Sequence, residues 1–309
     1  MRTLVIGESL IDVVQLPDGS TQEHVGGSPA NVAIGLARLG QDVLLATLVG
    51  DDERGARIAS HLENEGVSLA EGSIAGRSTS VARATLDATG AAAYSFDLSW
   101  ELPEPSLQGL AHVHTGSIAA TLEPGASAVL TTIQRARPDA TISYDPNARP
   151  SLMGDPHDVR AKIEALVGLS DVVRASDEDI AWLYAGAPIP DVLSRWAQLG
   201  PALTVVTRGG DGALVGLSTG EVDSLDAPTV AVVDTVGAGD SFMAGLLSGL
   251  LDAGLLGGTA ARERLRFASL ADIVPAVERA LACAAITVSR AGADPPRLAE
   301  LQERDAGHQ

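Results

Sequence analysis

The chain has 309 residues, of which 45% are hydrophobic and 20% are charged, so it can bury a substantial core and is neither disordered nor fibrous. Its 40 acidic and 21 basic residues give a net charge of −19, and such a surface repels nucleic acid and anionic membranes. Cys283 is the only cysteine and Lys162 the only lysine, which excludes an intrachain disulfide, a cysteine zinc site and a Walker-type phosphate loop.

The sequence carries no pattern typical of a secretion signal or a membrane span. The first apolar run ends at Gly7, before Glu8 and Asp12, and the apolar stretch 242–258 is interrupted by Asp252. We therefore expect a cytoplasmic protein without a membrane partner.

Strand-like and helix-like segments alternate along most of the chain. Thr3–Gly7 predicts the first strand, and Pro29–Leu39 predicts a helix that Ser28 caps and Gly40 ends. The other predicted strands are Val43–Leu48, Ala111–Thr115, Thr141–Tyr144, Asp171–Arg174 and Leu203–Thr207. The other predicted helices are Asp52–Glu65, Pro124–Ala136, Val159–Leu169, Glu178–Tyr184, Ala238–Ala253 and Ile273–Ser289. This alternation predicts an α/β fold of three αβα layers with a mostly parallel central sheet.

Two regions early in the chain break the alternation. Ser80–Leu86 and Ala91–Phe96 flank a turn signal at Asp87–Gly90 and predict a β-hairpin, and Ile11–Leu16 with Thr21–Val25 predict a second hairpin. Inserted hairpins of this kind form either a lid over a site or an ordinary sheet edge.

We expect a single domain with a small β lid. The domain would span residues 1–300, with lid strands inserted at about 11–25 and 78–98. The polar tail 301–309 is expected to be frayed.

The segment Asp234–Asp240, D-T-V-G-A-G-D, carries the strongest chemical signal. It follows a strand-like run, Val230–Val233, and opens a predicted helix. Glycines at a helix start let a ligand approach the backbone, and the unpaired N–H groups there favour an anion such as a phosphoryl group. Asp240 could then accept a proton from an attacking hydroxyl, whereas the alternative is a simple helix cap.

A second segment, Gly26–Ala33, reads G-G-S-P-A-N-V-A and is followed by Leu39 and Gly40. Together the two segments resemble the signatures G-G-x-x-x-N-x-A…L-G and D-T-x-G-A-G-D of the PfkB family of carbohydrate kinases, which has the ribokinase-like fold. The resemblance extends from Gly7 to about Pro296.

Further segments are similar to bacterial fructokinases of that family. Gly7–Asp12 is similar to their G-E-x-L-I-D opening, Asp145–Arg149 to D-P-N-x-R, and Val288–Ala293 to the loop of a cation site. Pro29-Ala30 stands where ribokinases have Lys-Gly. Ser176–Asp179 falls where many relatives carry N-x-x-E, a motif linked to magnesium and phosphate, so metal handling is the point where this chain departs from the family.

The resemblance implies roles for individual residues. Asp240 would be the general base, and the backbone of Gly237, Ala238 and Gly239 would be the anion hole. The implied sugar-binding residues are Asp12, Gly26, Gly27, Asn31 and Arg149. The implied nucleotide-binding residues are Thr207, Arg208, Gly209 and Gly212. Acceptor identity is expected to depend on the lid residues Tyr94, Phe96 and Trp100.

Several of these residues also fit plain structural roles. Asp12 could be a strand-end turn residue, Asn31 a solvent-facing helix position, and Arg149 a surface ion-pair partner. The element around Gly209 could be an ordinary hairpin turn.

The resemblance also implies cofactors. ATP would bind with Mg²⁺, held largely through water near Asp179, with Glu178 as a further carboxylate nearby. A monovalent cation, K⁺, would have as ligands the Asp234 carboxylate and the backbone carbonyls of Val236, Thr287, Arg290 and Gly292.

The sequence therefore predicts an ATP-dependent sugar kinase that phosphorylates a primary hydroxyl, with fructose as acceptor. The alternatives on the same fold are a 2-keto-3-deoxygluconate kinase, a ribokinase, a nucleoside kinase and a catalytically silent sugar-binding regulator. The expected partners are the sugar, ATP and a second copy of the chain through the lid.

Overall fold

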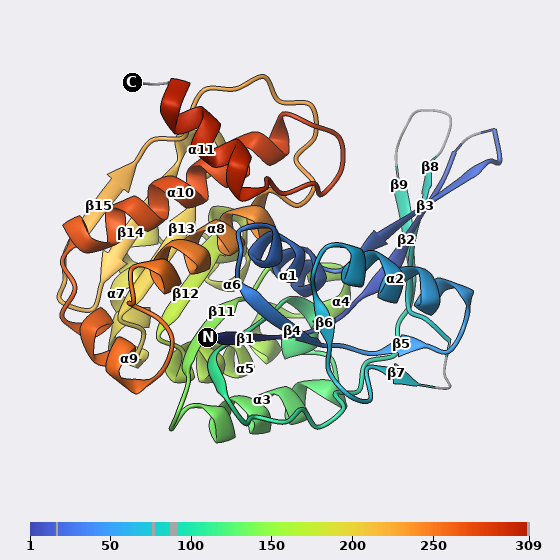
Figure 1. Ribbon diagram of the computed structural model, residues 1–309, viewed down its shortest axis with the longest axis horizontal. Helices are drawn as coiled ribbons and strands as arrows, with labels where there is room; N and C mark the ends of the chain where they lie inside the picture. Colours follow the sequence, from blue (N-terminus) through green and yellow to red (C-terminus); the bar gives the residue numbers. More distant parts are fainter. Residues whose placement is uncertain (17, 76–77, 87–91, 308–309) are drawn as a thin grey trace.

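The computed structural model describes residues 1–16, 18–75, 78–86 and 92–307. Within them the central sheet has nine strands in the order β15-β14-β13-β12-β11-β10-β1-β4-β6 (Figure 1). In this order, neighbouring strands from β13 through β1 to β6 pair in parallel. At the other edge, β13 with β14 and β14 with β15 pair antiparallel. The strands are β1 (Arg2–Ile6), β4 (Asp42–Ala46), β6 (Ser68–Leu69), β10 (Leu110–Gly116), β11 (Thr141–Asp145), β12 (Val172–Ser176), β13 (Leu203–Thr207), β14 (Ala213–Leu217) and β15 (Val222–Leu225).

Helices cover both faces of this sheet, which confirms the predicted αβα layers. Successive side chains of a strand point to opposite faces, so Val5 packs into one hydrophobic core while Leu4 and Ile6 pack into the other. The first core includes α1 (Ser28–Arg38), α2 (Glu53–Asn64), α8 (Ala238–Asp252), α9 (Thr259–Arg266) and α10 (Leu270–Val288). The second includes α3 (Gly125–Ala136), α5 (Pro156–Leu169), α6 (Asp177–Leu183) and α7 (Ile189–Leu199).

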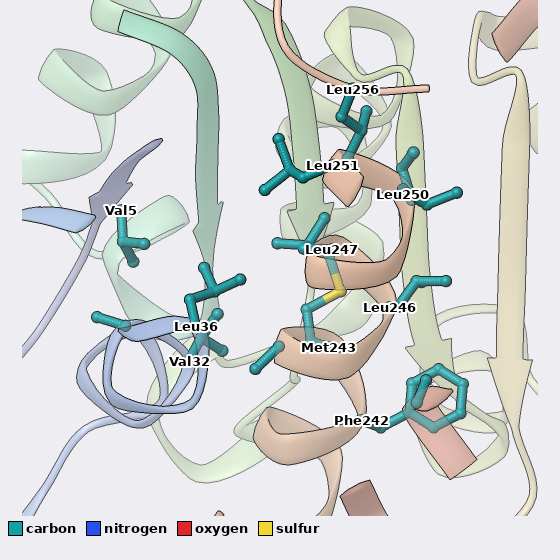
Figure 2. Close-up of a cluster of buried hydrophobic side chains, with 14 of the residues drawn as sticks. Val5, Val32, Leu36, Phe242, Met243, Leu246, Leu247, Leu250, Leu251 and Leu256 are labelled. Carbon is teal, nitrogen blue, oxygen red and sulfur yellow. The ribbon is translucent and has the colours of Figure 1, made fainter. Parts of the chain in front are cut away.

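The helix α8 lies between α1 and α10 and packs closely on both. A Cβ added to Gly249 would lie 2.8 Å from the Cα of Ala276 in α10, so the two helices approach more closely than larger residues would allow. On the other side, Leu247 of α8 lies in the same core as Leu36 of α1 (Figure 2). Small and aliphatic residues therefore fix α8 in the first core.

A separate four-stranded sheet stands at one side of the molecule, where the lid was predicted (Figure 1). The hairpins β2–β3 and β8–β9 are antiparallel and join through parallel pairing of β2 with β8. The turn predicted at Asp87–Gly90 lies outside the described residues. The strands are β2 (Leu10–Gln15), β3 (Thr21–Gly26), β8 (Val81–Leu86) and β9 (Ala92–Asp97), and β5 (Val49–Gly50) pairs with β7 (Ile74–Ala75) nearby.

Three local predictions were wrong. Val230–Val233 is not a strand. The run does not pair with a neighbouring strand of the described chain, and Val233 N donates to Val288 O at the end of α10 at 2.8 Å. Ser28 is the first residue of α1 rather than its cap, and Gly27 is the N-cap. The tail is not frayed from its start, since Leu298–Gly307 forms α11.

In the described part of the chain, every helix is too short or too polar to cross a membrane.

Candidate active site

A cavity of about 690 Å³ opens at the carboxyl ends of β11, β12 and β13, the edge where α/β sheets place ligands. The start of α8 forms one of its walls. The predicted site residues that line it are Arg149, Asp179, Thr207, Gly209, Gly212, Val236, Gly237, Ala238, Gly239 and Asp240.

The segment Asp234–Asp240, here called the anion turn, leads into α8. Gly237 is the N-cap and has φ 75°, a left-handed conformation that favours glycine. A Cβ on Gly237 would lie 2.5 Å from the Cβ of Ala293, so the position also lacks space for a side chain. The residues of the first turn of α8 line the cavity, and N–H groups at a helix start lack an intrahelical partner, which suits an anion. Among them, Ala238 N donates to Thr235 O at 3.3 Å.

The carboxylate of Asp240 is held by two segments that are far from it and from each other in the sequence. Ser28 Oγ donates to Oδ1 at 2.6 Å, and Asn31 Nδ2 donates to Oδ2 at 2.8 Å. Asn147 Nδ2 lies 3.4 Å from Oδ1. The two predicted signatures and the D-P-N segment therefore meet at one buried carboxylate, which is 7% exposed.

A chain of hydrogen bonds continues from this carboxylate to Arg149. Asn147 Nδ2 donates to Ser28 Oγ at 2.6 Å, and Arg149 Nη1 donates to Asn147 Oδ1 at 2.8 Å. Asn147 has φ 37°, an uncommon backbone conformation for a residue other than glycine, and such conformations cluster at functional sites. The D-P-N segment was recognised in the sequence, but no role was predicted for Asn147, and Ser28 was predicted only as a helix cap.

Arg174 is a site residue that sequence reasoning missed. It is 5% exposed, lines the cavity and lies directly against the anion turn: a Cβ on Gly239 would be 2.8 Å from Nη1. Nη1 is 3.0 Å from Asp145 Oδ2, Nη2 donates to Thr207 Oγ1 at 2.5 Å, and Nε has no partner among the described residues. The available signal was a charged residue inside an apolar strand, since buried charges are rare without a function or a partner.

The acid paired with Arg174 has an altered titration. Burial raises the pKa of Asp145 to about 6, although the guanidinium of Arg174 acts in the opposite direction.

The departure at Ser176–Asp179 has a structural explanation. Asp179 Oδ2 accepts from Ser176 N at 2.8 Å, and Ser176 Oγ accepts from Asp179 N at 3.0 Å, which is a capping box at the start of α6. Asp179 Oδ1 also accepts from Ala148 N at 2.7 Å and so fixes the turn that carries Arg149.

The predicted sugar-binding residues outside the cavity lie where the lid meets α1. Asp12 of β2 is exposed, and its Oδ2 would be 2.0 Å from a Cβ added to Gly26. Gly27 has φ 111°, and a Cβ there would lie 2.4 Å from the carbonyl oxygen of Glu8. Asp12 therefore lies over the glycine pair that precedes α1.

Glu8 is a second residue that sequence reasoning left without a role. It is buried, and its Oε2 accepts from Ala119 N at 3.2 Å. Burial raises its pKa to about 7, so its carboxyl group holds a proton well above the usual range.

Lid residues behave differently from the expectation that they set acceptor identity. Trp100 is 3% exposed and its Nε1 donates to Ala119 O at 3.0 Å, so it packs within the core and is not available to a ligand. Phe96 is partly exposed, and the side chain of Tyr94 lies outside the described part of the lid.

The predicted nucleotide-binding residues lie at the end of β13 and in the β13–β14 connection, and they differ in whether they line the cavity. Gly209 and Gly212 line the cavity, whereas Arg208 does not and its Nη2 donates to Ser224 Oγ at 2.7 Å.

The far wall of the cavity is apolar and was not predicted. It is formed by Val230, Val232, Phe242, Leu281, Ala284, Ala285 and Val288.

The predicted cation-site residues come from two segments, the anion turn itself and the end of α10 with the loop that follows it. Asp234 Oδ1 accepts from Val236 N at 3.0 Å and Oδ2 accepts from Gly292 N at 2.8 Å, so this carboxylate joins the two segments. Thr287 Oγ1 donates to Ser241 Oγ at 2.8 Å, and the Arg290 side chain pairs with acids away from the turn. In the described residues no three His, Cys, Asp or Glu side chains gather as a metal site.

Known proteins resemble this chain over nearly its whole length. Residues 2–299 match the family described as pfkB family carbohydrate kinase. Fructokinase from Klebsiella pneumoniae is 33% identical over 302 residues, with 94% of each chain covered. The structure of fructokinase from Xylella fastidiosa with bound ATP has a TM-score of 0.87 at 26% identity and covers 99% of this chain and 98% of that chain. A fructokinase double mutant from Vibrio cholerae O395, bound to fructose, ADP and potassium ion, has a TM-score of 0.78 at 26% identity over 94% and 93% of the two chains.

Proposed function

The chain belongs to the pfkB family of carbohydrate kinases and is an ATP-dependent sugar kinase, and from this premise we propose that its acceptor is fructose, phosphorylated at a primary hydroxyl. The observation that carries the proposed site is the buried Asp240 carboxylate beside the first-turn N–H groups of α8. Fructose as acceptor is supported by the fructokinase relatives and by the Gly7–Asp12 segment.

In the proposed reaction, Asp240 takes the proton of the sugar hydroxyl while the hydroxyl oxygen attacks the γ-phosphorus of ATP. The bond to ADP breaks, and ADP leaves. The N–H groups of Gly237, Ala238 and Gly239 hold the phosphoryl oxygens as negative charge moves onto the leaving group. The guanidinium of Arg174 lies against Gly239 of this turn, and its positive charge offsets the negative charge of the phosphoryl oxygens in an acidic chain.

The sugar is proposed to bind between the lid and α1. The carboxylate of Asp12, the amide of Asn31 and the guanidinium of Arg149 supply donors and acceptors for hydroxyl groups, and Gly26 and Gly27 leave room for the ring. The hydrogen bonds from Ser28 and Asn31 orient the Asp240 carboxylate before the sugar binds.

The nucleotide is proposed to lie along the cavity toward its apolar wall. Gly209 and Gly212 allow close approach of the backbone, Thr207 offers a hydroxyl, and Arg208 would act through its backbone because its side chain is engaged by Ser224.

Magnesium and potassium are proposed as the metals. Asp177, Glu178 and Asp179 line the cavity, and their carboxylates are hard oxygen donors of the kind that magnesium binds through water. Since both Asp179 oxygens already accept backbone N–H groups, its contact would be through water. Bound metal ions neutralise phosphate charge in this chemistry.

The residues proposed for potassium sit beside the anion turn. The Asp234 carboxylate and the carbonyls of Val236, Thr287, Arg290 and Gly292 are all oxygen donors, which suits such an ion.

The acceptor is tested with purified protein, Mg-ATP and a sugar panel of fructose, glucose, ribose, 2-keto-3-deoxygluconate and adenosine. Sugar-dependent ADP release should give the highest kcat/KM with fructose. Faster turnover of another compound would reassign the acceptor, and sugar binding by calorimetry without any turnover would favour a silent binding protein.

We also propose that two copies of the chain pair through the lid sheet, because the outer lid strands β3 and β9 carry exposed residues. Light scattering on the intact protein should give twice the chain mass of 31.6 kDa, and a monomer would contradict the pairing.

A further inference from the structure

The end of α1 opposite Asn31 carries a dense ion-pair cluster. Arg38 Nε and Nη2 donate to the two carboxylate oxygens of Glu65, each at 2.8 Å. Its Nη1 donates to Asp294 Oδ1 at 2.5 Å and to Pro295 O at 2.6 Å. The Arg38 side chain is only 11% exposed, so it is shielded from solvent screening and these bonds fix its position.

The segment that Arg38 holds, residues 290–295, packs against the anion turn and is here called the buttress loop. Its Ala293 leaves no space for a side chain on Gly237, and its Gly292 N donates to Asp234 Oδ2 at 2.8 Å. Asp294 N donates to Gly292 O at 2.9 Å, which closes the loop tightly. The N–H groups of the anion turn therefore rest on a loop whose carboxylate is bound by Arg38.

The helix α1 connects this cluster to the proposed base. Its Asn31 donates to Asp240, and its Gly35 touches α8, because a Cβ there would lie 2.6 Å from the Cβ of Ala244 and 3.6 Å from that of Pro295. A movement of the buttress loop relative to α1 would shift the anion turn relative to the groups that orient Asp240. Displacements of about 1 Å in such arrangements can cost up to about 10²-fold in rate.

We propose that Arg38 and Asp294 are positioning residues for phosphoryl transfer: their ion pair fixes the buttress loop and so sets the anion turn relative to the sugar-binding end of α1. This inference rests on the proposed roles of Asp240 and the anion turn. The pair touches neither substrate and acts through Ala293 and Gly237.

Glu65 and Arg297 provide a matched control. Arg297 Nη2 lies 3.0 Å from Glu65 Oε2, so Arg297→Gln removes an ion pair from the same cluster without touching the buttress loop. Arg297 is 59% exposed at its side chain, so the variant is expected to fold. Asp294→Asn keeps the shape of the loop residue and removes its charge, and at 40% exposure it is also expected to fold.

The test measures kcat and KM for ATP and sugar in Asp294→Asn, Arg38→Met, the double variant and Arg297→Gln, well below each melting temperature. Asp294→Asn should lower kcat/KM for ATP about tenfold, with a smaller change in the sugar KM, while Arg297→Gln keeps the parent values. Arg38→Met removes the pairs of Arg38 with Glu65 and Asp294, and Asp294→Asn removes the pairs of Asp294 with Arg38 and Arg290. The losses in the double variant should therefore be less than additive, because both single variants remove the Arg38–Asp294 pair.

Kinetics of Asp294→Asn within twofold of Arg297→Gln would overturn the positioning role, as would fully additive losses in the double variant. Failure of the proposed function would look different. Undiminished turnover in Asp240→Asn would remove the base assignment, and preference for another sugar would change the acceptor but leave the comparison of these variants intact.

Discussion

The phosphate side and the sugar side of the proposed site are built in different ways. Along α8, every residue from Asp240 to Leu251 is buried, whereas Gly26 is the only buried residue of lid strand β3. The anion turn contacts the buttress loop, Arg174 of β12 and the end of α10, which together fix it. The lid, in contrast, presents exposed side chains on a thin sheet. Packed backbone leaves little freedom for substitution. In the proposed site, substitutions are therefore expected to be tolerated less on the phosphate side than on the lid side.

Asp240→Asn should give the largest loss and should affect chemistry alone. The amide keeps the shape of the side chain but is a far weaker base, so kcat is expected to fall 10²- to 10⁴-fold. ATP affinity measured by calorimetry should stay near the parent value. Asp252→Asn, at the other end of α8, is the matched control, and a kcat within tenfold of that control would contradict the role of Asp240.

Gly237→Ala should break the packing that defines the phosphate side. The new Cβ would clash with Ala293, and the alanine would have to adopt the left-handed conformation that Gly237 has. We therefore expect the free energy of unfolding to fall by about 2 kcal/mol. The expected change in kcat/KM for ATP is about 10- to 100-fold.

Gly40→Ala is the control for conformational strain alone, because Gly40 has φ 86° and open space around its Cα. It should cost about 1 kcal/mol and leave ATP kinetics unchanged. Equal ATP kinetics in the two variants would show that contact with Ala293 is not needed.

Asp12→Asn should act on the sugar side only. Loss of the charge weakens hydrogen bonds to sugar hydroxyls, and the KM for sugar is expected to rise about tenfold with the KM for ATP unchanged. Asp18→Asn, an exposed aspartate of the same hairpin, is the control. A matching rise in the ATP KM would mean that the two sides are coupled more tightly than their packing indicates.

The parts of the site that sequence could predict are those coded locally. The glycines of the anion turn predict a helix start with little space for side chains and a left-handed backbone conformation. The alternating strands and helices predict a parallel sheet. Both depend on residues adjacent in the chain, and the structure has them where they were expected.

The parts that were missed depend on contacts between distant segments. Ser28 looks like a helix cap from its neighbours, but it lies 212 residues from Asp240 in sequence and 2.6 Å from it in space. Arg174 looks like an ordinary strand residue until β11, β12 and β13 lie side by side and bring Asp145 and Thr207 to it. Asp179, which stands where the family motif has Glu, accepts from Ser176 N at the start of α6 and from Ala148 N in a distant turn.

Glu8→Gln should give the smallest effect on catalysis and a distinct effect on stability, since Glu8 lies beneath the sugar side. Its pKa is raised from 4.5 to about 7 by burial, so the folded protein binds a proton that the unfolded chain has lost between these values. The contribution of Glu8 to the stability of the parent protein should therefore fall as pH rises from about 4.5 to 7, by on the order of 3 kcal/mol.

Glutamine has no proton to lose, so the variant should gain stability relative to the parent as pH rises from 5 to 8. His112 and His114 have pKa values lowered to about 3 by burial, so they stabilise the fold increasingly as pH rises toward 6.5. Both proteins contain them, and their contribution cancels in the difference. Urea unfolding at pH 5, 6, 7 and 8 measures that difference. A value that stays constant across the series would show that Glu8 is ionised in the folded protein at pH 5, and that the sugar side rests on a charged rather than a neutral carboxyl group.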